Sequence, residues 1–127
     1  MSIVNSTTFS SELEKLKDVG NSIVIDVETN GLDPYGCNQI CGVGVGESKV
    51  KGFTQYYPFR HHQGENLNTE HLKELIDFLN TSINIFIGYN IKFDLHFLEK
   101  EGLDVSNKKL VDVIVMVRLV EPSEIKE

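Results

Sequence analysis

The chain has 127 residues, two cysteines and a formal net charge of -7, from 12 Lys plus Arg against 19 Asp plus Glu. A chain of this length suits a single domain over residues 1–127 that buries roughly two-thirds of its unfolded surface, so neither disulfides nor structural zinc are needed. The acidic balance argues against a protein that binds nucleic acid mainly through a basic surface. It does not exclude a metal-dependent nuclease, because bound divalent cations would reverse the local charge.

No leader peptide is apparent, and no apolar run approaches the ~20 residues that span a bilayer. We therefore expect a cytoplasmic protein without membrane contact. The first predicted element is a helix over residues 9–19, where apolar residues recur at helical spacing. Ser11 and Glu14 resemble a capping box, and Gly20 is expected to end the helix.

The next segment, Ile23 to Pro34, reads IVIDVETNGLDP. Its apolar start predicts a buried strand, and residues two apart on a strand point to the same side, so Asp26 and Glu28 share one face. Two like charges at this spacing repel unless a cation lies between them. The pair indicates either a divalent-metal site or two solvated residues where a strand enters a turn, and the segment alone favours neither.

A second strand is predicted from Gln39 to Gly46, where glycines occupy every second position. One face of this strand therefore carries no side chains, which would let a helix or neighbouring backbone approach the sheet closely. The spacing does not match a dinucleotide-binding loop. Residues Val50 to Phe59 are expected to return as the second strand of a hairpin, followed by a polar loop over residues 60–64.

The remaining elements predict an α/β layered order. A helix capped by Asn68 or Thr69 is followed by a strand from Ile83 to Tyr89 and by a helix that begins at Asn90 and ends before Gly102. The first of these two helices should pack on the sheet through its apolar residues, which are Leu72, Leu75, Ile76 and Leu79.

Asn90 and Asp94 are four residues apart, so they share one face near the start of the last predicted helix. Asp94 is flanked by apolar residues, where an unpaired charge is costly. A metal ion would compensate that charge. The alternative is that Asn90 is an ordinary N-cap and Asp94 a first-turn acid favoured by the helix dipole.

Taken together, these segments resemble the DEDD superfamily of 3′-to-5′ exonucleases, whose first motif is D-x-E and whose second includes N-x-x-[FY]-D. The similarity is greatest to the proofreading domain of family A DNA polymerases. It is carried, in the family's order, by IVIDVETNGLDP, YYPFRHH, GYNIKFDLHFL and LVDVIVMVRLVEP. The resemblance implies a ribonuclease H-like α/β fold: a mixed sheet with an antiparallel hairpin and then parallel strands, helices on both faces, and the C-terminal part of the domain missing.

The resemblance also implies hydrolysis of single-stranded DNA from its 3′ end with two divalent ions, Mg²⁺ or Mn²⁺. Hard cations of this kind prefer oxygen ligands, and two of them can stabilise the attacking and leaving oxygens. By position, Asp26 would bridge both ions, Glu28 would complete one site and Asp94 would serve the second. These three residues are the expected metal ligands and catalytic residues.

Four further residues match positions expected to contact substrate: Asn90, Leu32, Thr29 and Phe93. Leu32 corresponds to an apolar wedge against terminal bases, although an ordinary core leucine is equally consistent with the sequence. Asp112 matches an acid with a structural role.

The family also has a fourth acid on a later helix, preceded by a Tyr or His that orients the attacking water. Nothing marks Glu121, Glu124 or Glu127 as a substitute, and the four histidines are expected at the surface or in loops. We therefore expect one bound ion or none, and weak or absent catalysis. The alternatives are a non-catalytic domain that binds nucleic acid or protein, and an enzyme completed by an acid from a partner chain.

The segment Val111–Val120 is apolar almost all round. The resemblance predicts a helix here, while its β-branched residues leave a strand possible. Because contiguous apolar surface is usually an interaction site, we expect a second copy or a polymerase module to cover it.

Overall fold

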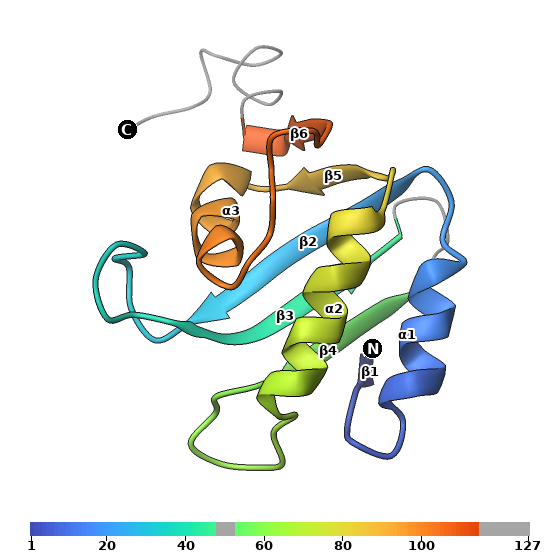
Figure 1. Cartoon of the computed structure of the whole chain (residues 1–127), viewed down its shortest axis with the longest axis vertical. Helices are drawn as coiled ribbons and strands as arrows, with labels where there is room; N and C mark the ends of the chain where they lie inside the picture. The colour runs from blue at the N-terminus through green and yellow to red at the C-terminus, as the bar shows by residue number, and fades with distance from the viewer. Residues whose placement is uncertain (48–52, 115–127) are drawn as a thin grey trace.

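The computed structural model describes residues 1–47 and 53–114. Over these ranges, three helices pack on one six-stranded sheet (Figure 1). In chain order the elements are β1 (Ser2–Ile3), α1 (Phe9–Lys17), β2 (Ser22–Thr29), β3 (Ile40–Gly46), β4 (Thr54–Pro58), α2 (Thr69–Thr81), β5 (Ile85–Gly88), α3 (Ile91–Lys100) and β6 (Leu110–Asp112).

The strand order is β1-β4-β3-β2-β5-β6. The three central strands β2, β3 and β4 pair antiparallel, whereas β5 lies parallel to β2 and β6 parallel to β5. The predicted mixed sheet, an antiparallel hairpin followed by parallel strands, is therefore confirmed. The two-residue strand β1, which pairs parallel with β4, was not predicted.

All three helices lie over the same face of the sheet (Figure 1). The alternation along β2 reflects this arrangement. Its buried apolar side chains are those of Ile23, Ile25 and Val27, and its exposed side chains are those of Val24, Asp26 and Glu28. We call the second face, over which no described residue forms a helix, the open face. The resemblance predicts helices on both faces of the sheet. Within residues 1–47 and 53–114, helices cover only one face.

Helix α2 forms as its sequence predicts. The Asn68 side chain accepts the His71 backbone N–H, and the His71 ring accepts the Asn68 N–H, which completes a capping box. The leucines and isoleucine of the predicted stripe are all buried in the core. Burial of each such side chain contributes about 1.5–3 kcal/mol relative to exposure, which fixes α2 on the sheet.

The predicted capping box of α1 is wrong. The helix begins at Phe9 with Thr8 as the N-cap, so Ser11 lies inside the first turn and its hydroxyl donates to the Thr8 carbonyl at 3.0 Å. Glu14 pairs with Lys17 at 3.2 Å instead. The helix also ends at Lys17, before the expected stop. By contrast, the C-terminal stop of α3 is found at Gly102, whose φ of +109° few other residues adopt.

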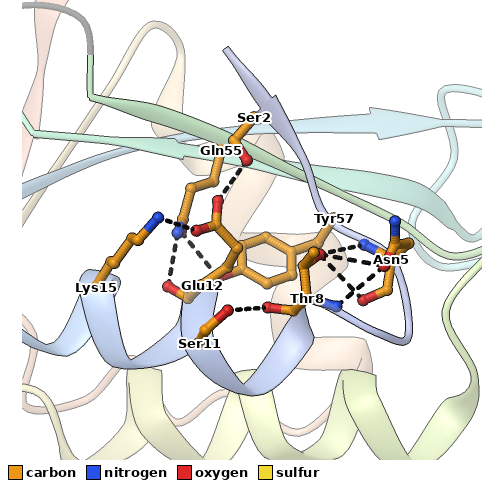
Figure 2. Close-up of polar contacts among 8 residues, drawn as sticks. All are labelled: Ser2, Asn5, Thr8, Ser11, Glu12, Lys15, Gln55 and Tyr57. Carbon is orange, nitrogen blue, oxygen red and sulfur yellow. Dashed lines mark hydrogen bonds and ion pairs between the residues drawn. The ribbon is translucent and has the colours of Figure 1, made fainter.

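A buried carboxylate, Glu12, joins α1 to the edge of the sheet (Figure 2). It accepts a hydrogen bond from Ser2 of β1 and lies 2.8 Å from Lys15 Nζ. Gln55 of β4 donates to the Glu12 backbone carbonyl at 2.6 Å and accepts from the Tyr57 hydroxyl at 2.8 Å. The hydrogen bonds from Lys15 and Ser2 hold the pKa of Glu12 below its usual range.

The first residues of the segment Val111–Val120 form the end of β6, so the predicted helix is wrong for Val111 and Asp112. The strand forms because Val111 pairs with Ile87 of β5, and its β-branched side chain suits that environment. Residues 115–120 lie outside the described residues, as do Glu121, Glu124 and Glu127. Within residues 1–47 and 53–114, no helix is long and apolar enough to cross a membrane.

Candidate active site

The two predicted carboxylates of β2, Asp26 and Glu28, lie on the open face. The residues that pair with them on the neighbouring strand β3 are glycines: Asp26 pairs with Gly44 and Glu28 with Gly42. The pairing register shifts between Glu28 and Thr29. Such irregularities bend a strand and re-aim its side chains, and they are common beside active sites. Glu28 is therefore the last residue of β2 before its regular pairing with β3 is interrupted, and Asp26 lies two residues earlier.

Helix α3 reaches this strand end because β5 is short. The pairing of β5 with β2 stops at Val24 of β2. The chain then turns through Asn90, whose φ of 54° is left-handed. A Cβ on Gly88 would lie 3.0 Å from Ile91 and 3.2 Å from the Ile25 carbonyl oxygen, so glycine allows the close entry into the helix. Asp94, in the first turn of α3, is 4% exposed.

Asp94 lies in a negative environment. Burial raises its pKa to about 7, with further contributions from Asp26, Asp112 and Glu28, while a backbone hydrogen bond from Val27 opposes the shift. Its buried Oδ2 atom has no hydrogen-bond partner. The fold thus brings Asp94 of α3 to Asp26 and Glu28 of β2, and leaves one carboxylate oxygen unsatisfied.

These carboxylates are close enough to interact electrostatically but are not arranged as a preformed ligand set. In the part of the chain that the structure describes, no three His, Cys, Asp or Glu side chains stand close enough to hold a metal ion. Like charges without a counter-charge separate, and exposed side chains such as those of Asp26 and Glu28 have room to do so. The residue types fit a divalent cation, since all three offer oxygen ligands.

Asp112 has a structural contact at the end of β6. Its Oδ1 accepts the backbone N–H of Asn90 at 2.9 Å and that of Ile114 at 3.0 Å. The carboxylate therefore fixes the left-handed turn that leads into α3. This contact places Asn90 by its backbone, and its exposed side chain makes no cap hydrogen bond, so Asn90 is not an ordinary N-cap.

The other predicted substrate residues differ in exposure. Leu32 is 83% exposed in the loop after β2, which rules out the core alternative. The Thr29 hydroxyl donates to the Gly31 carbonyl at 2.6 Å, so its proton is used within that loop. Phe93 is half-buried and packs against Phe97, with ring centroids 5.1 Å apart.

Tyr56 of β4, which is not among the predicted site residues, also lies on the open face. It is paired with Gly44, and its hydroxyl lies 2.6 Å from Nε2 of His61. Burial raises the pKa of Tyr56 to about 12, with contributions from Glu28, Cys41 and Asp26. The period-two alternation of β4, set against the glycines of β3, is the sequence signal that could have identified it.

The glycines of β3 do not make room for a helix, which was one of the two expected reasons for them. A Cβ on Gly42 would lie 1.9 Å from the Tyr56 hydroxyl, so this glycine makes room for an aromatic side chain. At Gly46 the close neighbour is backbone, as expected, because a Cβ there would lie 3.0 Å from the Phe53 carbonyl oxygen.

Residues 2–125 match the family model of the 3′-5′ exonuclease domain of type A DNA polymerases. The chain belongs to this 3′-5′ exonuclease family. Its sequence is 31% identical over 114 residues to DNA polymerase I of Synechocystis sp., a match that covers 89% of this chain and 11% of the polymerase. The predicted family is thereby confirmed, and the chain spans about a tenth of that relative's length.

Solved structures of low sequence identity share the fold. The RNase domain of yeast Pop2 superposes with a TM-score of 0.64 and 14% identity, over 97% of this chain and 70% of that one. An exonuclease I gives a TM-score of 0.60 and 12% identity, over 78% and 29%. Exonuclease I from Methylocaldum szegediense gives 0.59 and 15%, over 82% and 30%. These likenesses confirm the ribonuclease H-like fold of this 3′-5′ exonuclease domain.

Proposed function

We propose that this domain acts on 3′ ends of single-stranded DNA by metal-dependent hydrolysis of the terminal phosphodiester. The observation that carries the proposal is that Asp94 of α3 lies near enough to Asp26 and Glu28 of β2 for the three carboxylates to interact electrostatically. Burial and the neighbouring acids raise the pKa of Asp94, and its Oδ2 is buried without a partner. A site with this excess of negative charge cannot accept a phosphate unless cations neutralise it.

Asp26, Glu28 and Asp94 would hold the cations, which are Mg²⁺ or Mn²⁺ by the chemistry of their ligands. When bound, such ions activate water and stabilise the attacking and leaving oxygens. The protein's own part is to fix the ligands. Asp94 is held by its burial and by the Val27 backbone, while the exposed Asp26 and Glu28 must turn toward it when the charge is neutralised.

The substrate would approach from the open face, where the acids are exposed. Leu32 projects from the loop after β2 and offers an apolar side chain to a terminal base. Asn90, with an exposed side chain, and Phe93, with a half-buried ring, lie on the same stretch of chain as Asp94, at the start of α3. We assign DNA rather than RNA from the likeness to a DNA polymerase, and the substrate comparison below tests this choice.

We expect this chain to bind one ion or none and to be a slow or inactive enzyme. Over residues 1–47 and 53–114 the three carboxylates interact but form no preformed metal group, and loosely held ions stabilise the charge of the transition state less. The absence of a preformed three-residue metal group over these ranges also favours the alternative, a non-catalytic domain that binds nucleic acid or protein.

The test uses the full chain with a 5′-labelled single-stranded DNA and an RNA of the same sequence, with Mn²⁺ or with EDTA. We expect Mn²⁺-dependent binding of DNA, slow shortening from the 3′ end, and loss of both in Asp26→Asn. The control is Asp77→Asn, which removes an exposed carboxylate on α2. Binding that is unaffected by EDTA and by Asp26→Asn would overturn the proposal, rapid shortening would overturn the expected slow rate, and binding without any shortening would support the non-catalytic alternative.

A further inference from the structure

Two side chains beside the carboxylates, Tyr56 and His61, form a pair that the proposed reaction does not use. Tyr56 belongs to β4 and His61 to the loop that follows it, and their rings are 5.6 Å apart between centroids. Tyr56 is half-buried and His61 is exposed. The next residue along the strand, Tyr57, points to the opposite face and is fully buried in the core.

The glycines of β3 give the Tyr56 ring its position. A Cβ on Gly42 would lie 1.9 Å from the Tyr56 hydroxyl oxygen, and one on Gly44 would lie 3.9 Å from the ring. The phenol therefore lies over Gly42 and close to Gly44. Since Gly42 pairs with Glu28, the hydroxyl is directed to the end of the sheet that carries the acids.

The loop also fixes His61. Its backbone N–H donates to Asn66 Oδ1 at 2.9 Å, and Asn66 Nδ2 donates to the His61 carbonyl at 2.9 Å. This reciprocal pair closes the loop, so Nε2 of His61 stays within 2.6 Å of the Tyr56 hydroxyl. An exposed histidine held in this way fixes the tyrosine at the surface without burying it.

We propose that Tyr56, held by His61 and seated on Gly42, contacts the single-stranded nucleic acid at the carboxylate site and positions its end. This inference rests on the proposed function. A core role does not account for Tyr56, because the ring lies on the open face. A partly exposed tyrosine supplies a surface on which a base stacks, and with the His61 ring as the donor in their hydrogen bond, its hydroxyl proton is available to a phosphate oxygen.

Binding of a fluorescein-labelled oligothymidylate, measured by fluorescence anisotropy in Mn²⁺, tests the proposal. Stacking of one base on an aromatic ring corresponds to at least about a fivefold change in affinity, so Tyr56→Ala should weaken binding by that factor or more. Tyr56→Phe keeps the ring and loses the hydroxyl, and its affinity should lie between those of the wild type and Tyr56→Ala.

The matched control is Tyr57→Phe, which removes the same hydroxyl from the helix-covered face. It loses the hydrogen bond to Gln55 and should lower the melting temperature, while the affinity of the folded protein for the oligonucleotide stays unchanged. The Tyr56 variants should show the opposite pattern, with weaker binding and little change in melting temperature.

Gly42→Ala provides a second test that leaves Tyr56 itself in place. The added methyl group must displace the end of the Tyr56 ring, so this variant should weaken binding about as much as Tyr56→Ala. In the double variant the two effects should not add, because they remove one contact. An additional loss in the double variant would contradict the seating of Tyr56 on Gly42.

The outcomes separate this inference from the proposed function. If the wild type binds the oligonucleotide in Mn²⁺ and Tyr56→Ala and Gly42→Ala bind equally well, the inference is overturned and the proposed function stands. If the wild type shows no Mn²⁺-dependent binding, both are overturned.

Discussion

At the scale of single residues, Asp94 is the clearest conflict between stability and function. A carboxylate that is 4% exposed, with one oxygen unsatisfied and three acids acting on it, costs the folded state free energy. Nothing in the described core requires a charge at this position. Such a cost is common where a side chain serves a ligand rather than the fold.

This cost can be measured with Asp94→Asn in the absence of divalent metal. The amide keeps an oxygen for the Val27 hydrogen bond and removes the repulsion, so we expect a melting temperature a few degrees above that of the wild type in EDTA at pH 8. Addition of Mn²⁺ should stabilise the wild type and leave Asp94→Asn unchanged. A destabilised variant in EDTA would show that the carboxylate serves the fold.

The residues of the candidate site also differ in how readily the amino-acid sequence predicts their positions. Asp26 and Glu28 could be placed on one face from strand periodicity, and Asp94 on a helix near its start, because both inferences need only local geometry. Alternation along β4 can assign Tyr56 to the face of the β3 glycines but cannot place it beside the carboxylates, since that position depends on which residue of β3 it pairs with. That register is set by pairing across the hairpin, which the local sequence does not specify.

At the scale of elements, α1 is held to the sheet by a buried carboxylate as well as by its apolar residues. The Glu12 carboxylate accepts from Ser2 of β1 and pairs with Lys15 of its own helix, and its backbone carbonyl accepts from Gln55 of β4 (Figure 2). Its pKa is lowered in the folded state, so its contribution to stability is fully present above its unfolded value of 4.5 and is lost as the pH falls through the folded value.

Glu12→Gln should therefore lower the free energy of unfolding by about 1.5–3 kcal/mol at pH 7, the range for hydrogen bonds to charged groups. Below pH 4.5 the difference from the wild type should shrink as Glu12 becomes protonated. Urea unfolding at pH 7 and pH 3.5 measures both. The control Glu14→Gln removes an exposed pair on the same helix and should cost no more than about 0.5 kcal/mol; an equal loss in both variants would contradict the role of Glu12.

The elements that were predicted are those with a repeated local pattern. Helix α2 has a cap and an apolar stripe, and β2 and β3 alternate over seven or eight residues. Strands β1 and β6 have two and three residues, too few for a period, and exist because distant strands offer them hydrogen bonds. The predicted capping box of α1 is wrong because Ser and Thr, which favour N-caps, occupy positions 6, 7, 8, 10 and 11, and the helix starts after Thr8.

At the scale of the whole molecule, the net charge of -7 requires that any nucleic acid be attracted locally. A protein that neutralises many phosphates with Lys and Arg shows a steep fall of affinity with salt. Here the attraction would come from cations held by Asp26, Glu28 and Asp94.

We therefore expect oligothymidylate binding in Mn²⁺ to weaken by less than about tenfold between 50 and 200 mM salt, against the 10³-fold or greater loss of a basic protein. EDTA should abolish binding at every salt concentration. Anisotropy titrations over this range measure the slope, with Asp26→Asn as the metal-site control. A steep slope together with binding in EDTA would show that basic side chains dominate.

The short pairing between β5 and β2 has one further consequence. Beyond Val24 no strand continues the ladder on that side of β2 in the described residues, and the Val27 N–H is met by the Asp94 carboxylate of α3 instead. The Asp94 side chain thus supplies the hydrogen-bond acceptor that a neighbouring strand would otherwise provide, and it is also a candidate metal ligand. Amide hydrogen exchange at Val27 would then report occupancy of the site, because any change in how Asp94 is held alters the protection of that one backbone proton.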